Sequence, residues 1–151
     1  MNTKQLASYK NANYTLQKTR QIVLLYDAAI RFTRQAQQAI EEKDFGLRFE
    51  LLQKVSNILA GLHSALDYEN GGEISKVLSS FYTGLDMRVI GINRSNSLKE
   101  CEYVMSELKN MRDSWEKIDQ QYGIADKPVA QQVYSPLDQR ELVTESANFT
   151  A

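Results

Sequence analysis

The feature that most constrains this chain is a long N-terminal stretch without proline. The first proline is Pro128, so residues 1–127 contain none. Proline breaks a helix interior because it lacks the amide donor and its ring clashes with the preceding turn. In the same stretch, apolar residues recur at steps of three and four, as on one face of a helix, and no strand-like alternation competes. Together these features predict an all-α fold.

The apolar spacing predicts four helices, over residues 19–43, 44–68, 72–93 and 98–122. Asp44 stands where its side chain can cap the second helix. Ser97 and Glu100 form the pattern of a capping box before the fourth helix. The expected connections, at residues 43–44, 70–72 and 94–96, are short, so sequential helices should lie antiparallel. We therefore expect an antiparallel up-down-up-down four-helix bundle.

The two ends of the chain lie outside this pattern. Residues 1–18 are polar with isolated apolar side chains, and we expect an N-terminal arm there, before a bundle domain of residues 19–122. Residues 123–151 are rich in Gln, Ser and Thr and carry two basic and four acidic side chains. That composition is typical of a flexible, disordered tail. Ser135 before Pro136 is also a helix-start pattern, so a short, conditionally ordered helix is the alternative.

The composition argues against several classes of partner and compartment. A formal net charge of −1 provides no concentrated cationic field, so we expect no nucleic-acid partner. No apolar run approaches the length of a membrane span, so we expect no membrane insertion. The single cysteine cannot form an internal disulfide. These features predict a soluble, cytoplasmic protein.

The residues that could carry chemistry each have a structural interpretation. His63 is the single histidine, and it lacks the Glu-x-x-His spacing of di-iron bundles. Cys101 falls on the apolar face of the fourth predicted helix, where a small buried side chain is typical. Acidic neighbours such as Glu116 and Asp119 lie on polar faces and are expected to be solvated. We expect no catalytic residues, no metal and no cofactor.

The first predicted helix is apolar nearly all round in its N-terminal half, which is unusual for the outer helix of a simple bundle. The side chains concerned include Ile22, Val23, Tyr26, Ala29 and Ile30. One explanation is deep burial in an irregular bundle. The other is a second apolar surface, reserved for the N-terminal arm or for a partner helix.

Several segments, taken in order along the chain, resemble those of one known family. Residues 25–32 read Leu-Tyr-Asp-Ala-Ala-Ile-Arg-Phe, which matches a family signature except at Ala28, where Gly is usual. Residues 39–45, 69–74 and 112–115 are similar to three further family segments. The resemblance covers about residues 6–120 and is to FliS, the flagellar export chaperone family that binds flagellin. Gln17 and Lys18 depart from it, since Ser-Pro or Thr-Pro is usual before the first helix.

The resemblance implies a function for the apolar surface. The family binds the C-terminal segment of flagellin, prevents its premature polymerisation and delivers it to the flagellar type III export gate. We therefore expect a flagellin-binding groove formed by the side chains Ile22, Val23, Tyr26, Ala29 and Ile30. In the arm, Leu6 and Tyr9 resemble an element that covers this groove or docks on the export gate. Gly71, Gly72 and Trp115 belong to structural motifs of the family.

Two alternatives remain open at the level of the sequence. The bundle could be a helical adaptor that binds another amphipathic helix, such as a regulatory factor. It could also be a small helical enzyme or a metal carrier, although no convergent set of polar residues supports this class. The sequence does not decide which flagellin is bound, whether the chain forms a homodimer, or what residues 123–151 do.

Overall fold

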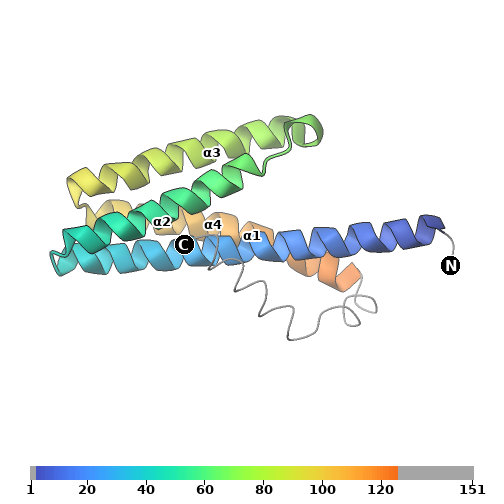
Figure 1. The fold of residues 1–151 in the computed structure, drawn as a ribbon, viewed down its shortest axis with the longest axis horizontal. Coiled ribbons are helices and arrows are strands. Elements are labelled where there is room, and N and C mark those ends of the chain that lie inside the picture. The colour runs from blue at the N-terminus through green and yellow to red at the C-terminus, as the bar shows by residue number, and fades with distance from the viewer. Residues whose placement is uncertain (1–2, 126–151) are drawn as a thin grey trace.

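The computed structural model describes the backbone of residues 3–125 and the side chains of residues 18–121. Within this part the chain forms four helices: α1 (Thr3–Glu41), α2 (Phe45–Ser64), α3 (Tyr68–Ser95) and α4 (Leu98–Ala125). Short links join them into an antiparallel bundle (Figure 1). The predicted all-α four-helix fold is confirmed. The predicted tail and its short helix lie outside the described residues.

Helix α1 begins much earlier than the sequence predicts. Its first residue is Thr3, whereas the apolar spacing predicts a start at residue 19. The chain contains neither proline nor glycine before Gly46, so nothing in the backbone chemistry ends the helix in the predicted arm. The backbone of residues 3–18 therefore continues α1 in a straight line (Figure 1).

Side-chain caps fix the starts of the other three helices. Asp44 accepts a hydrogen bond from the Leu47 amide at 3.1 Å and caps α2, as predicted. Ser97 accepts one from the Glu100 amide at 3.1 Å before α4. The carboxylate of Glu100 does not complete the predicted capping box. It accepts instead from Arg88 of α3 at 3.1 Å and so joins two helices.

The link between α2 and α3 differs from the prediction. Residues 70–72 are expected to form a loop, but α3 already begins at Tyr68, with Asp67 accepting hydrogen bonds from the amides of Glu69 and Asn70. The irregularity falls inside the helix, at Gly72, where φ is +52° and ψ is −128°. This conformation favours glycine and kinks the first turn of α3 away from the rest of the helix.

The core lies along α1, which packs chiefly against α4 and α2, while α3 packs mainly on α2 and only weakly on α4. Small side chains on α1 allow this close approach, and they include Ala28, Ala29, Ala36 and Ala39. Larger apolar side chains from α2, α3 and α4 fill the space between. Because α3 is held mostly from one side, the linked ends of α2 and α3 diverge from α1 (Figure 1).

Candidate functional site: an apolar groove at the open end of the bundle

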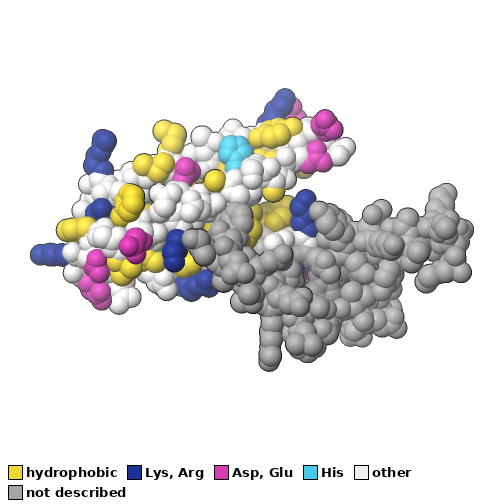
Figure 2. Space-filling view, in the orientation of Figure 1, with side chains coloured by type: hydrophobic (Ala, Val, Ile, Leu, Met, Phe, Trp, Pro, Cys, Tyr) yellow, Lys and Arg dark blue, Asp and Glu magenta, His cyan; other side chains and the backbone are white. Residues whose placement is uncertain are grey.

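The divergence of α2 and α3 from α1 leaves an open groove with a volume of about 590 Å³. All four helices line it, and the residues are Lys18, Thr19, Gln21, Ile22, Leu25, Gly61, Leu62, Ala65, Leu66, Asp67, Gly71, Ile74, Ser75, Leu78, Tyr82 and Trp115. In Figure 2 the molecule is notched between the α2–α3 link and α1, and hydrophobic side chains are visible at the notch. A concave apolar surface of this kind fits a helix with one apolar face.

Small residues bring the backbone close to the groove surface on two walls. Gly61 and Ala65 lie one turn apart on the α2 side, and Gly71 and Ser75 lie one turn apart on α3. Ser75 leaves the groove no free hydroxyl, because its Oγ donates to the Asp67 carbonyl at 2.7 Å. These walls can therefore take a bulky side chain of a partner without a polar group being left unpaired.

Aromatic residues form the inner end of the groove. Tyr82 of α3 and Trp115 of α4 both line it. The hydroxyl groups of Tyr82 and Tyr26 are hydrogen-bonded at 2.9 Å, and the Trp115 side chain is a further partner of Tyr26. Burial, with the neighbouring Tyr82, raises the pKa of Tyr26 far above its ordinary value. The pair is therefore neutral, and it joins the groove to the core.

The charged residues of the groove lie at its mouth. Lys18 is on α1 and Asp67 is on the α2–α3 link. The pKa of Asp67 is lowered, chiefly by hydrogen bonds from Asn70. The positive charge of Lys18 is a smaller cause in the same direction. One positive and one negative charge give the mouth no net charge, so apolar contact is the main interaction that the groove offers.

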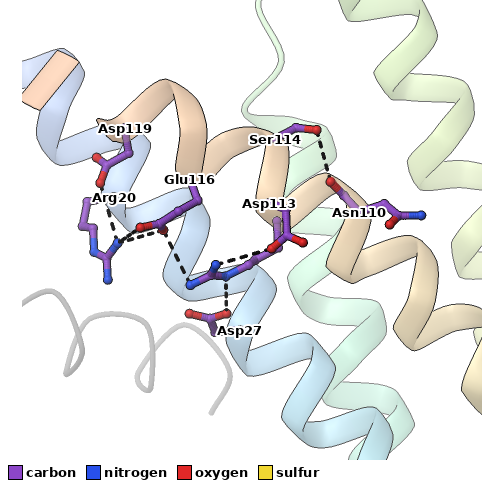
Figure 3. Close-up of polar contacts among 8 residues, drawn as sticks. Arg20, Asp27, Asn110, Asp113, Ser114, Glu116 and Asp119 are labelled. Carbon is purple, nitrogen blue, oxygen red and sulfur yellow. Dashed lines mark hydrogen bonds and ion pairs between the residues drawn. The ribbon is translucent and has the colours of Figure 1, made fainter. Parts of the chain in front are cut away.

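A cluster of ion pairs holds α1 against α4 beside the groove (Figure 3). Arg20 contacts Glu116 at 3.0 Å and Asp119 at 3.6 Å. Arg112 contacts Asp27 at 2.8 Å and Glu116 at 3.5 Å. The expectation that Glu116 and Asp119 are solvated is wrong, since their side chains are only 22% and 16% exposed.

The ionisation of these groups reflects their partial burial. Burial raises the pKa of Asp119, and Arg20 opposes that rise. The hydrogen bond to Asp27 raises the pKa of Arg112. Opposite charges from α1 and α4 thus offset the cost of removing the carboxylates from water. The cluster fixes the α1 wall of the groove relative to Trp115 on α4.

The residues predicted to form the groove fall into three different environments. Ile22 lines it. Ile30 lies in a separate, smaller pocket between α1 and α4, together with Arg34 and Lys109. Val23, Tyr26 and Ala29 are 0% exposed and belong to the core. Deep burial therefore explains most of the apolar surplus of α1, because α2 and α4 cover this helix from two sides.

Most of the groove residues were not predicted. Leu62 and Leu66 from α2 and Ile74, Leu78 and Tyr82 from α3 form its larger part. Periodicity places them on the core side of their helices but cannot tell that the helices diverge there. Ile74 shows the difference most clearly, because the apolar spacing places it on the core side of α3 whereas its side chain is 71% exposed.

Of the remaining residues that the sequence analysis names, three lie at the groove, and the side chains of the other two lie outside the described part of the chain. Trp115 is half-buried at the groove, and Gly71 and Gly72 lie at its α3 edge. The side chains of Leu6 and Tyr9 lie outside the described part of the chain.

The histidine and the cysteine have the structural roles expected of them. The His63 Nε2 atom is hydrogen-bonded to Ser79 Oγ at 2.8 Å, between α2 and α3. Cys101 is fully buried, as predicted. Among residues 18–121, no three potential ligands gather in a way that would hold a metal ion. No helix of the described part is both long and apolar enough to cross a membrane.

Comparison with known proteins assigns this fold to a family. The family described as flagellar protein FliS matches residues 1–122. The flagellar secretion chaperone FliS of Salmonella typhimurium is 34% identical over 98 residues, which are 64% of this chain and 73% of that protein. FliS of Campylobacter jejuni is 29% identical over 97 residues, or 64% of this chain and 76% of that protein. FliSB of Pseudomonas aeruginosa is 30% identical over 99 residues, or 66% and 79%.

All three relatives carry the name of a flagellar secretion chaperone, and none carries the name of an enzyme. The family match spans α1, α2, α3 and all but the last three residues of α4, and it includes every residue that lines the groove. This chain belongs to the FliS family of flagellar secretion chaperones, which is not a family of enzymes.

Proposed function

We propose that this chain binds the C-terminal segment of flagellin in the groove between α1, α2 and α3, in the cytoplasm where flagellin is made. The observation that supports the proposal is the groove itself, with its volume of about 590 Å³ and its mostly apolar lining. Flagellin subunits assemble by burying amphipathic terminal helices. A chaperone that covers such a helix beforehand prevents premature polymerisation.

The energetics of capture favour a long apolar site. A segment that folds on binding loses conformational entropy, typically about 2–5 kcal/mol of the gross interaction energy. Association also costs roughly 4–15 kcal/mol of translational and rotational freedom. At roughly 25 cal/mol per Å², burial of about 240–800 Å² of apolar surface is needed to offset both losses. The groove offers apolar side chains from all four helices, so a partner helix can contact apolar surface on several of its sides.

The test compares two exposed positions on the same helix. Ile74 is 71% exposed and lines the groove, whereas Val77 is 66% exposed and does not line it. We expect Ile74→Lys to weaken binding of a C-terminal flagellin peptide about 10-fold or more, because a charge would enter an apolar contact. Val77→Lys should bind like the unaltered protein. Calorimetric titration measures both.

Two results would contradict this proposal. Equal affinities of the Ile74→Lys and Val77→Lys variants would exclude the groove as the binding site. Co-purification of this chain with a flagellin that lacks its C-terminal segment would exclude that segment as the ligand. Thermal unfolding of both variants serves as the control, since neither substitution removes a buried side chain.

We further propose that the chaperone delivers flagellin to the export gate through the first turns of α1. The backbone of residues 3–17 continues the helix away from the groove, which supports a role at the gate. Changing both Leu6 and Tyr9 to Ser should leave binding of flagellin intact and reduce its secretion. Unchanged secretion of flagellin from cells with the double variant would contradict this role.

A further inference from the structure

One side of α3 carries exposed apolar side chains that belong neither to the core nor to the groove. Val77, Met87 and Ile90 are 66%, 70% and 57% exposed, and none of them lines the groove. Helix α3 forms one outer edge of the bundle (Figure 1), and hydrophobic side chains are visible along that edge (Figure 2). A group of exposed apolar side chains of this kind is typical of an interaction surface.

The exposed residues on this side of α3 have a regular spacing. They recur in steps of four and three along the helix beyond the kink at Gly72. Such a 3.5-residue repeat is the one by which two helices pack along their length. We call the seven positions the α3 face, and they are Glu73, Val77, Ser80, Gly84, Met87, Gly91 and Arg94.

The α3 face is complementary to itself when two copies of the helix run antiparallel. With Gly84 of both copies at the centre, Met87 lies opposite Ser80 of the second copy, and Val77 lies opposite Gly91. A large side chain thus meets a small one at each level, as close packing requires. Glu73 lies opposite Arg94, so opposite charges meet at both ends.

The two glycines of the α3 face are not explained by contacts within one chain. A Cβ at Gly84 or Gly91 would meet nothing within 4 Å, and neither residue has a positive φ. Glycine in a helix interior costs about 0.8–1.0 kcal/mol relative to alanine. A second helix packed on this face explains the glycines, because small residues let two helix axes approach to about 8 Å.

We propose that two copies of this chain pair through their α3 faces, antiparallel about a two-fold axis at Gly84, and that both grooves stay open in the pair. A two-fold axis requires that each surface match itself, which the α3 face does. Leu78 and Tyr82, which line the groove, lie roughly 150° or more around the helix from the centre of the α3 face, at about 100° per residue. Cargo can therefore enter each groove without displacing the second copy.

The pair should form reversibly. The α3 face is about 33 Å long at 1.5 Å per residue, and a single helix contact of this length is smaller than a standard interface of about 1,600 Å². We therefore expect a dissociation constant of about 1–100 µM. Each chain keeps a complete core of its own, so variants that do not pair should still fold.

Sedimentation velocity of the full chain, over concentrations that span this constant, measures the pairing. The unaltered chain should change from monomer to dimer. Met87→Glu should weaken pairing about 30-fold or more, because two charges enter an apolar contact. Asn57→Glu adds the same charge at an exposed position of α2 and should pair like the unaltered chain. An unaltered chain that stays monomeric throughout, or equal pairing of the two variants, would overturn the proposal.

Charge reversal tests the antiparallel register. Glu73→Arg sets two positive charges opposite each other, and Arg94→Glu sets two negative ones, so each variant should weaken pairing about 3- to 10-fold. The double variant restores opposite charges at both ends and should pair like the unaltered chain. The two positions are roughly 30 Å apart within one helix, so recovery requires contact between copies. A double variant that pairs no better than the single ones would overturn the proposal.

Calorimetry with a C-terminal flagellin peptide tests whether pairing and cargo binding are independent, a part that rests on the proposed function. We expect one peptide per chain, equal affinity for the unaltered chain and Met87→Glu, and a dimer that persists with peptide bound. Conversion of the dimer to monomer by the peptide would overturn the open grooves. If the peptide binds no variant while pairing depends on the α3 face, the proposed cargo is wrong and the dimer stands.

Discussion

At the scale of single residues, the pairing of Tyr26 with Tyr82 decides how the groove is built. The sequence predicts that Tyr26 faces flagellin, but its ring is fully buried and its hydroxyl is bonded to that of Tyr82 at 2.9 Å. Tyr82 in turn lines the groove. A substitution at Tyr26 therefore acts on the stability of the bundle first, and on binding only through Tyr82 and Trp115.

Removal of one hydroxyl of this pair should destabilise the fold. We expect Tyr26→Phe to lower the free energy of unfolding by about 1–2 kcal/mol, because the Tyr82 hydroxyl would be left buried without its partner. Urea denaturation measures this value. The double variant Tyr26→Phe, Tyr82→Phe should cost clearly less than the sum of the two single variants. Additive effects would show that the hydrogen bond contributes nothing.

The raised pKa of the Cys101 thiol should make the free energy of unfolding depend on pH. Burial, with Glu102 as a lesser cause, raises the pKa of this thiol from 9.0 to about 11. Between these values the unfolded chain loses the proton and the folded chain keeps it, so the free energy of unfolding falls as the pH rises. We expect it to fall more steeply from pH 9 to 11 in the unaltered chain than in Cys101→Ala. Parallel curves would contradict the assignment, since all other titrating groups are shared.

At the scale of helices, the kink at Gly72 sets the direction in which α3 leaves the α2–α3 link. Its φ of +52° and ψ of −128° lie where side chains with a Cβ are strained. Gly71 is also restricted, because a Cβ there would overlap Ser75 Oγ, which holds the Asp67 carbonyl. The two glycines therefore shape one edge of the groove, and neither forms the predicted loop.

A matched pair of glycine substitutions on α3 tests this role. Gly72→Ala should lower the free energy of unfolding by about 1–3 kcal/mol, the usual cost of a strained backbone conformation. Gly84 is in regular helix, and a Cβ there meets nothing within 4 Å. Gly84→Ala should therefore raise the free energy of unfolding by about 0.4–1 kcal/mol. Chemical denaturation of both variants measures these changes, and effects of the same sign would contradict the assignment.

At the scale of the whole molecule, the four helices are unequally held. Helices α1, α2 and α4 share most of the core, and ion pairs tie α1 to α4. Helix α3 packs mainly on α2, and its outer surface exposes apolar side chains such as Val77, Met87 and Ile90. Helices α1, α2 and α4 are thus tightly packed together, whereas α3, which lines the groove, is packed less tightly.

This inequality predicts a pattern of amide hydrogen exchange. Residues 68–80 should exchange faster than residues 19–40, because local opening is easier where fewer buried contacts are lost. A bound C-terminal flagellin peptide should slow exchange in residues 68–80 and in the second half of α2. Mass spectrometry of the exchanged protein measures both. Uniform protection along the bundle, with or without peptide, would contradict the unequal packing.

The sequence alone determined the class of fold and the order of the helices. Absence of proline before Pro128 and apolar steps of three and four are local properties, so they predict helices without knowledge of the neighbours. The same is true of the caps at Asp44 and Ser97. The chain-long order of motifs also pointed to the family that the comparison confirms.

Only the tertiary structure decided where the groove lies. Val23, Tyr26 and Ala29 are apolar in sequence whether they face a partner or the core, and the contacts of α1 with both α2 and α4 place them in the core. The groove arises because the linked ends of α2 and α3 diverge from α1. Divergence depends on the sum of contacts between helices that are distant in sequence, and no local pattern encodes that sum.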